Sequence, residues 1–148
     1  MKKSKITPFH SYLAVWVFIP LLFPAGMLAQ PYNLTASVSD PTPSANDELT
    51  VSVSITDPLD LYYAEIECTY DTDILDLVSV QTAGLTSGGL CSYGEISRGT
   101  IGASVSRTEA LAAPSAGSFM NLLFRVKSTT GADSTGFVLT NQELNNSS

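Results

Sequence analysis

The chain has 148 residues, with seven basic and fourteen acidic side chains and a net charge of −7. This length suits one domain and not two. The acidic balance excludes nucleic-acid binding by phosphate neutralisation, which requires clustered lysine and arginine.

Residues 1–29 have the layout of a secretory signal peptide. Three lysines precede the apolar stretch Leu13–Leu22, and small residues lead up to Ala29. We expect cleavage near Ala29–Gln30, which leaves 30–148 as one domain that is secreted, extracellular or held at the cell surface without a membrane span. An uncleaved anchor is the alternative, because the apolar stretch approaches the length of a spanning helix.

Loss of this leader changes the chemistry of the chain. Three basic residues leave and no acidic one does, so four positive and fourteen negative charges remain, a net charge of −10. His10, the one histidine, also leaves, which excludes a Ser/His/Asp triad and a zinc site with histidine ligands. Glu65 and Glu67 form an acidic pair, but outward charges on a strand are usually a solvated face. We expect no enzymatic activity and no cofactor.

The first strands come early in the domain. Asn33–Val38 is expected to form an edge strand, and a turn cluster at Asp40–Asp47 follows it. Glu48–Ile55 alternates apolar and polar residues without a break, which is typical of a half-buried strand. Thr56–Leu61 is expected to be a loop.

The stretch Ala64–Val80 then predicts a strand, a corner and a second strand. Ala64, Ile66, Cys68 and Tyr70 share one face and are expected in the core. Asp71-Thr72-Asp73 breaks the alternation; the three residues could supply oxygen ligands to Ca²⁺, but they lack the other residues of an EF-hand loop, and a capped turn is the simpler interpretation. No metal site is predicted.

The rest of the chain continues as short strands. These are expected at Leu90–Tyr93, Thr100–Val105, Phe119–Lys127 and Gly136–Leu144, with a turn at Gly94–Gly99. No long amphipathic helix is predicted. About eight strands with turns between them predict an all-β fold, an antiparallel β-sandwich of two sheets.

Three segments resemble the cohesin domains of cellulosome scaffoldins. They are Val51-Ser-Val53 leading into Ala64-x-Ile66-x-Cys68-x-Tyr70-Asp71, then Gly99-Thr-Ile101, and Gly117-Ser-Phe119 through Phe124-Arg-Val126-Lys127. The resemblance spans residues 34–144, although Thr72 stands where the family often has proline. It implies jelly-roll topology. We expect no counterpart before Ser148 of the family's final strand, which closes a sheet beside the first strand: either the chain is truncated or this strand is absent.

The resemblance also implies a function. Cohesins bind dockerin-bearing proteins through one sheet face, which suggests a binding module in a polysaccharide-degrading system. The implied partner-binding residues face outward on two strands. They are Tyr63, Glu65, Glu67, Thr69, Gly102 and Ser104.

Two other classes of function stay open. Direct carbohydrate binding would use exposed aromatic rings, for which the domain offers Tyr32, Tyr62, Tyr63 and Tyr93 but no tryptophan. A structural or adhesion module of a surface protein is the other alternative.

Cys68 and Cys91 allow one disulfide, which export would favour. In the resembled fold a strand separates them, which puts them about 9–10 Å apart, too far for a bridge. A position of Cys91 in a loop across the end of the core would permit the bridge. Both alternatives stay open.

Overall fold

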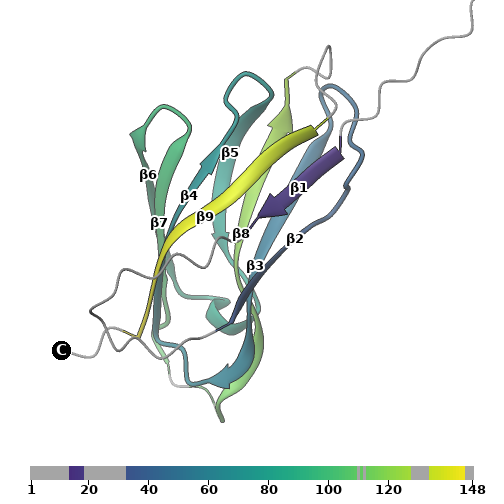
Figure 1. Ribbon diagram of the computed structural model, residues 1–148. Helices are drawn as coiled ribbons and strands as arrows, with labels where there is room; N and C mark the ends of the chain where they lie inside the picture. Colours follow the sequence, from purple (N-terminus) through teal and green to yellow (C-terminus); the bar gives the residue numbers. More distant parts are fainter. Residues whose placement is uncertain (1–13, 19–32, 110, 112, 128–133, 146–148) are drawn as a thin grey trace, which may run out of the picture.

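The computed structural model describes residues 14–18, 33–109, 111, 113–127 and 134–145. In these ranges the chain forms two β-sheets that face each other across a hydrophobic core (Figure 1). The elements are β1 (Ala14–Phe18), β2 (Leu34–Val38), β3 (Glu48–Leu59), β4 (Tyr63–Tyr70), β5 (Leu75–Thr82), the short 3₁₀ helix η1 (Gly84–Thr86), β6 (Leu90–Ser97), β7 (Thr100–Ser106), β8 (Ser115–Val126) and β9 (Ser134–Leu144).

One sheet has the strand order β2-β3-β8-β5, and all its strands are antiparallel. Strand β3 is central, and its inward residues from Leu49 to Ile55 alternate with half-buried polar residues. Strand β2 is an edge strand, paired only with β3 among the residues that the structure describes. The closing strand that the family resemblance implies is therefore not seen beside β2 within those residues.

The second sheet has the order β1-β9-β4-β7-β6. Strands β9, β4, β7 and β6 are antiparallel, whereas β1 pairs parallel to β9. Strand β1 belongs to the apolar stretch of the predicted leader, and the rest of residues 1–29 lies outside the described residues. The structure therefore leaves leader cleavage as a prediction.

The core lies between the sheets and follows the predicted alternation. Ala64, Ile66 and Cys68 of β4 are buried as expected. Phe124 of β8 is fully buried, with its ring in edge-to-face contact with Tyr70 at 5.0 Å and with Phe137 at 6.2 Å between ring centres. Such contacts add to the free energy of area burial and join strands from both sheets.

The predicted capped turn after β4 is confirmed. The carboxylate of Asp71 accepts a hydrogen bond from the backbone N–H of Asp73 at 2.9 Å, which is the preferred use of aspartate in a turn. Arg98 then spans this corner, donating to Thr72 Oγ1 at 3.0 Å and to Asp73 Oδ1 at 2.6 Å. Asp73 is therefore paired with an arginine.

Strands β8 and β9 begin earlier than predicted, at Ser115 and not Phe119 and at Ser134 and not Gly136. Two further boundaries differ from the sequence-based prediction. Strand β6 runs to Ser97, so most of the predicted turn at Gly94–Gly99 is strand, and only Arg98 and Gly99 make the turn. Strand β3 continues to Leu59, into the predicted loop. Gly94 in β6 and Pro58 in β3 are typical turn residues, which is why turns or loops were predicted there. Backbone pairing of β6 with β7 and of β3 with β8 keeps both segments extended.

The possible disulfide between Cys68 and Cys91 is not formed, and both cysteines are free. Strand β7 lies between their strands, with Cys68 opposite Ile101 and Cys91 opposite Val105. The two strands are about two strand spacings, or 9–10 Å, apart, and the two cysteines are also offset along β7 from Ile101 to Val105. Their separation is therefore beyond the reach of a bridge. Burial raises the pKa of the Cys68 thiol to about 12.

Candidate functional site

The predicted site residues lie on the side of the β9-β4-β7-β6 sheet that faces away from the core. Inward and outward residues alternate along each strand, and residues paired across antiparallel strands share a face. We call this surface the outer face. It consists of Asn141 and Glu143 (β9), Tyr63, Glu65, Glu67 and Thr69 (β4), Thr100, Gly102, Ser104 and Ser106 (β7), and Leu90, Ser92, Gly94 and Ile96 (β6).

A β-bulge in β9 sets the composition of the outer face. Leu139 lies opposite Cys68 and is buried, whereas Asn141 lies opposite Glu67, so Thr140 is the extra residue. One additional residue reverses the alternation of a strand. Without the bulge, Asn141 and Glu143 would share the inward side with Leu139. The bulge therefore adds a third carboxylate to the outer face.

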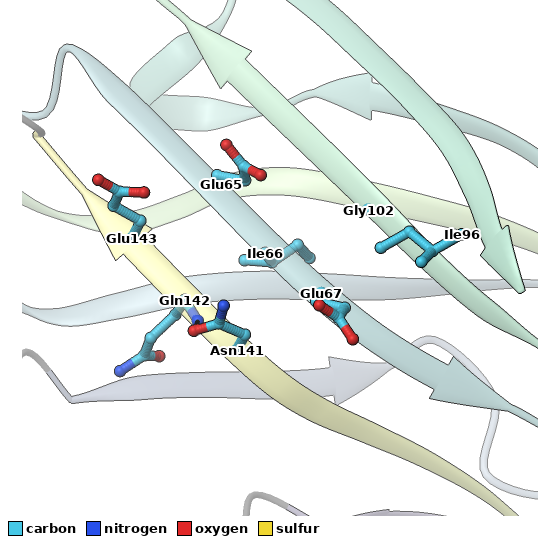
Figure 2. Close-up of a pocket in the computed structure, with 8 residues that line it drawn as sticks. All are labelled: Glu65, Ile66, Glu67, Ile96, Gly102, Asn141, Gln142 and Glu143. Atoms are coloured by element: carbon cyan, nitrogen blue, oxygen red, sulfur yellow. Dashed lines mark hydrogen bonds between the residues drawn. The ribbon is translucent and has the colours of Figure 1, made fainter. Parts of the chain in front are cut away.

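A shallow hollow crosses the middle of this face (Figure 2). Gly102 lies opposite Glu67, and an added Cβ there would come within 3.2 Å of Ile96 Cδ1. The hollow holds about 50 Å³, whereas small-molecule sites usually hold at least ~300 Å³. It is therefore smaller than a usual small-molecule site. Its lining consists of Glu65, Ile66, Glu67, Ile96, Gly102, Asn141, Gln142 and Glu143.

The outer face is strongly acidic. Glu65 and Glu143 lie directly opposite each other on β4 and β9, and Glu67 follows on the same face. Among the described residues, no lysine or arginine forms an ion pair with these three carboxylates. Their charges are therefore free to attract a basic partner.

Tyr63 and Glu65 are joined by a hydrogen bond on this face, in which the tyrosine hydroxyl donates to Glu65 Oε2. This bond, with smaller contributions from burial and from the charges of Glu65 and Glu143, raises the pKa of Tyr63 to about 12. The bond needs a protonated hydroxyl, and the raised pKa extends the pH range over which Tyr63 donates to this carboxylate.

The start of β4 is held by two side chains from other parts of the chain. Asn145 accepts from the backbone N–H of Tyr62 at 2.7 Å and of Tyr63 at 3.3 Å, and its side-chain amide donates to Asp60 O at 2.6 Å. Arg107 donates to Leu61 O at 3.3 Å. These contacts hold the backbone at the start of β4 and so help to position Tyr63 and Glu65 on the outer face.

The six predicted partner-binding residues share the outer face. Three of them, Glu65, Glu67 and Gly102, line the hollow. Tyr63 does not line it but donates a hydrogen bond to Glu65, which does. Thr69 and Ser104 lie on the same face but not in the hollow. The sequence analysis missed the hollow-lining residues Ile96, Asn141, Gln142 and Glu143, because β6 was predicted too short and a bulge leaves no clear trace in an alternation pattern.

The exposed tyrosines do not form one platform. Tyr63 lies opposite Ser106 on the outer face, whereas Tyr93 lies opposite Ala103, on the other side of the sheet. Tyr62 precedes β4 and is 47% exposed. Tyr32 lies outside the described residues. The aromatic strip that stacks on a flat polysaccharide is therefore not formed by Tyr63 and Tyr93 together.

A family model for the cohesin domain matches residues 34–147 of the chain. The chain belongs to the cohesin domain family. Cohesin modules are non-catalytic binding domains. The match extends over β2 to β9 and so includes every strand of the outer face. No curated protein sequence matches the chain.

Solved cohesin structures share the fold of this cohesin. The second type II cohesin module of the adaptor scaffoldin ScaA from Acetivibrio cellulolyticus is 15% identical with a TM-score of 0.65, over 79% of this chain and 80% of that one. The sixth cohesin of scaffoldin B from the same organism, solved with a Cel5 dockerin, is 16% identical with a TM-score of 0.61 and coverages of 75% and 84%. A cohesin module of a family 33 glycoside hydrolase from Clostridium perfringens is 14% identical, with a TM-score of 0.62 and coverages of 76% and 82%.

The described residues contain no helix long and apolar enough to cross a membrane.

Proposed function

We propose that this cohesin binds a dockerin-type protein through its outer face and takes no part in catalysis. The support is the family match together with structural relatives solved in complex with dockerins. The observation that carries the proposal is the hollow, which has Gly102 on its β7 side and three carboxylates along β4 and β9.

The two sides of the outer face differ in chemistry. Glu65, Glu67 and Glu143 lie on the β4 and β9 side, while Ile96 and Leu90 lie on the β6 side and are 62% and 68% exposed. Small side chains on β7 separate the two sides, so a helix can approach the sheet closely. The complementary surface is a helix with basic residues toward β4 and β9 and apolar residues toward β6.

We also propose export, followed by cleavage near Ala29–Gln30, which fits a module that acts outside the cell in a polysaccharide-degrading system. Cleavage there would remove β1 and leave β9 as an edge strand. Mass spectrometry of the secreted protein tests this directly: a first residue near Gln30 is expected, and a chain that begins at Met1 would contradict cleavage.

The function is tested by binding assays with dockerin-bearing proteins from the same organism, run beside retention on insoluble polysaccharide. We expect saturable dockerin binding that weakens when Glu65, Glu67 and Glu143 are together replaced by glutamine. Replacement of Glu109, an exposed glutamate outside the outer face, by glutamine is the matched control. Retention on polysaccharide that Tyr63→Ala abolishes, without a dockerin partner, would overturn the proposal in favour of carbohydrate binding.

A further inference from the structure

Strand β6 concentrates the exposed apolar surface of the described chain. All eight of its residues are exposed, and among the residues that the structure describes its backbone pairs with β7 alone, so its other backbone edge is open there. Toward the other sheet, the Cys91 thiol donates to Val80 O of β5 at 3.4 Å. Leu90, Tyr93 and Ile96 are 68%, 47% and 62% exposed and are three of the five large hydrophobic residues that are exposed in the described part of the chain. An open edge with apolar side chains is a template for pairing with another strand.

The hydrogen-bond pattern shows which backbone groups point outward. Arg107 N donates to Tyr62 O and Tyr70 N donates to Gly99 O, so the odd-numbered residues of β7 bond to β4 and the even-numbered ones to β6. On β6, the residues opposite these even-numbered positions are Leu90, Ser92 and Gly94, and their backbone groups therefore bond to β7. The N–H and C=O groups of Cys91, Tyr93 and Glu95 consequently point to the open side.

The three exposed hydrophobic residues are spaced evenly along β6. Leu90 and Ile96 lie equally far from Tyr93 in the sequence, one before it and one after it. In an antiparallel pair of two β6 strands centred on Tyr93, each Leu90 lies opposite the other copy's Ile96, on the outer face. The same register pairs Cys91 with Glu95 and Tyr93 with itself, and these are the residues whose backbone groups point away from β7. About six backbone hydrogen bonds would form, two for each of these pairs.

We propose that this edge joins two copies of the chain into a symmetric dimer through antiparallel β6 strands. Charge favours this register, since Glu95 is the one charged residue of β6 and lies opposite the other copy's Cys91 and not opposite another carboxylate. The contact is isologous, so it closes at two copies. The β-bulge between Glu95 and Ser97 ends the pairing at Ile96. The outer faces of both copies then form one continuous surface.

The register can be tested by charge placement, with sedimentation velocity over a concentration series of the exported protein. Leu90→Lys with Ile96→Lys puts like charges opposite each other at both ends of the interface, and we expect dimerisation to weaken by about tenfold or more. Leu90→Glu with Ile96→Lys puts opposite charges there, and we expect much of the affinity to return. A protein that stays monomeric at every concentration, or a dimer that both pairs weaken equally, overturns the proposal.

Cross-linking tests the symmetry axis independently. In a Cys91→Ser background, Tyr93→Cys places one thiol of each copy in a directly opposed pair about 5.5 Å apart between Cα atoms, within the range of a disulfide. The control is Tyr62→Cys, because Tyr62 and Tyr93 are both 47% exposed. We expect Tyr93→Cys to form covalent dimers much faster than Tyr62→Cys; equal rates contradict the interface. The dimer does not depend on dockerin binding, so either proposal can fail alone.

Discussion

Tyr63 and Glu65 lie two residues apart on the same side of β4, and the tyrosine hydroxyl donates a hydrogen bond to the glutamate. Both side chains belong to the acidic part of the outer face. The hydrogen bond restricts the carboxylate before a partner arrives, which lowers the entropy that must be lost on binding. It also links the site to pH, because it depends on a protonated hydroxyl group.

The raised pKa of Tyr63 predicts a change in stability at high pH. Its pKa is about 12 in the folded protein against the ordinary 10.0, so the stabilisation is complete below pH 10 and is lost as the pH rises through about 12. Tyr63→Phe removes this contribution. We expect the free energy of unfolding of the natural protein to fall more steeply above pH 10 than that of the variant. Parallel curves from denaturant titrations would contradict the assignment.

The carboxylates of the outer face predict salt-dependent binding. We expect Glu65→Gln, Glu67→Gln and Glu143→Gln each to weaken dockerin binding by about two- to fivefold, as is typical of exposed ion pairs. Each loss should shrink as the salt concentration rises, because salt screens exposed charges. Isothermal titration calorimetry measures both effects, with Glu109→Gln as the matched control. Losses that are the same at all salt concentrations would exclude an electrostatic role.

A larger residue at Gly102 should block the β7 side of the hollow sterically. In Gly102→Leu the new Cβ comes within 3.2 Å of the flexible end of Ile96, which can move aside. We therefore expect little loss of stability but loss of most dockerin binding, since the added side chain keeps a helix away from the sheet. Thermal unfolding and calorimetry measure the two quantities.

The matched control for Gly102→Leu is Ser37→Leu. Ser37 is exposed on β2, in the opposite sheet. This variant should bind like the natural protein. Unchanged binding by Gly102→Leu would remove the hollow from the docking site.

The cysteines predict a simple thiol count. The denatured protein should show two reactive thiols without reductant, because Cys68 and Cys91 are not bridged. In the folded protein Cys68 should be inert, since it is fully buried and its pKa is raised to about 12. Cys91 is exposed and should react first. Reaction with a chromophoric disulfide reagent measures both counts; no thiols in the denatured protein would show a bridge.

The sequence-based predictions were most accurate where the alternation of apolar and polar residues alone determines which side of a strand is buried. The apolar face of Ala64, Ile66 and Cys68 predicted the inward side of β4, and the outward side then followed for Glu65 and Glu67. In β7 the same parity placed Gly102 and Ser104 on the outer face. A half-buried strand permits only one assignment of faces, so these residues could be assigned without a structure.

The rest of the site depends on features that alternation does not encode. The bulge at Thr140 reverses the alternation of inward and outward residues in β9 and turns Glu143 outward. In the sequence, one extra residue cannot be told apart from an ordinary irregularity in the alternation of apolar and polar residues. Strand β6 was predicted too short because Gly94 resembles a turn residue, yet pairing with Gly102 keeps it extended. Ile96 was therefore missed as a neighbour of the hollow.

The most direct test of the docking face is NMR of the isotope-labelled protein, with amide shifts followed as an unlabelled dockerin is added. We predict that the largest changes occur at Glu65, Glu67 and Gly102 and extend to Asn141 and Ile96. The outward side of the opposite sheet, where Ser52 donates to Asn121 Oδ1 at 2.8 Å, should not change. Changes confined to Ser52, Asn121 and their neighbours, with none around Gly102, would contradict the proposed face.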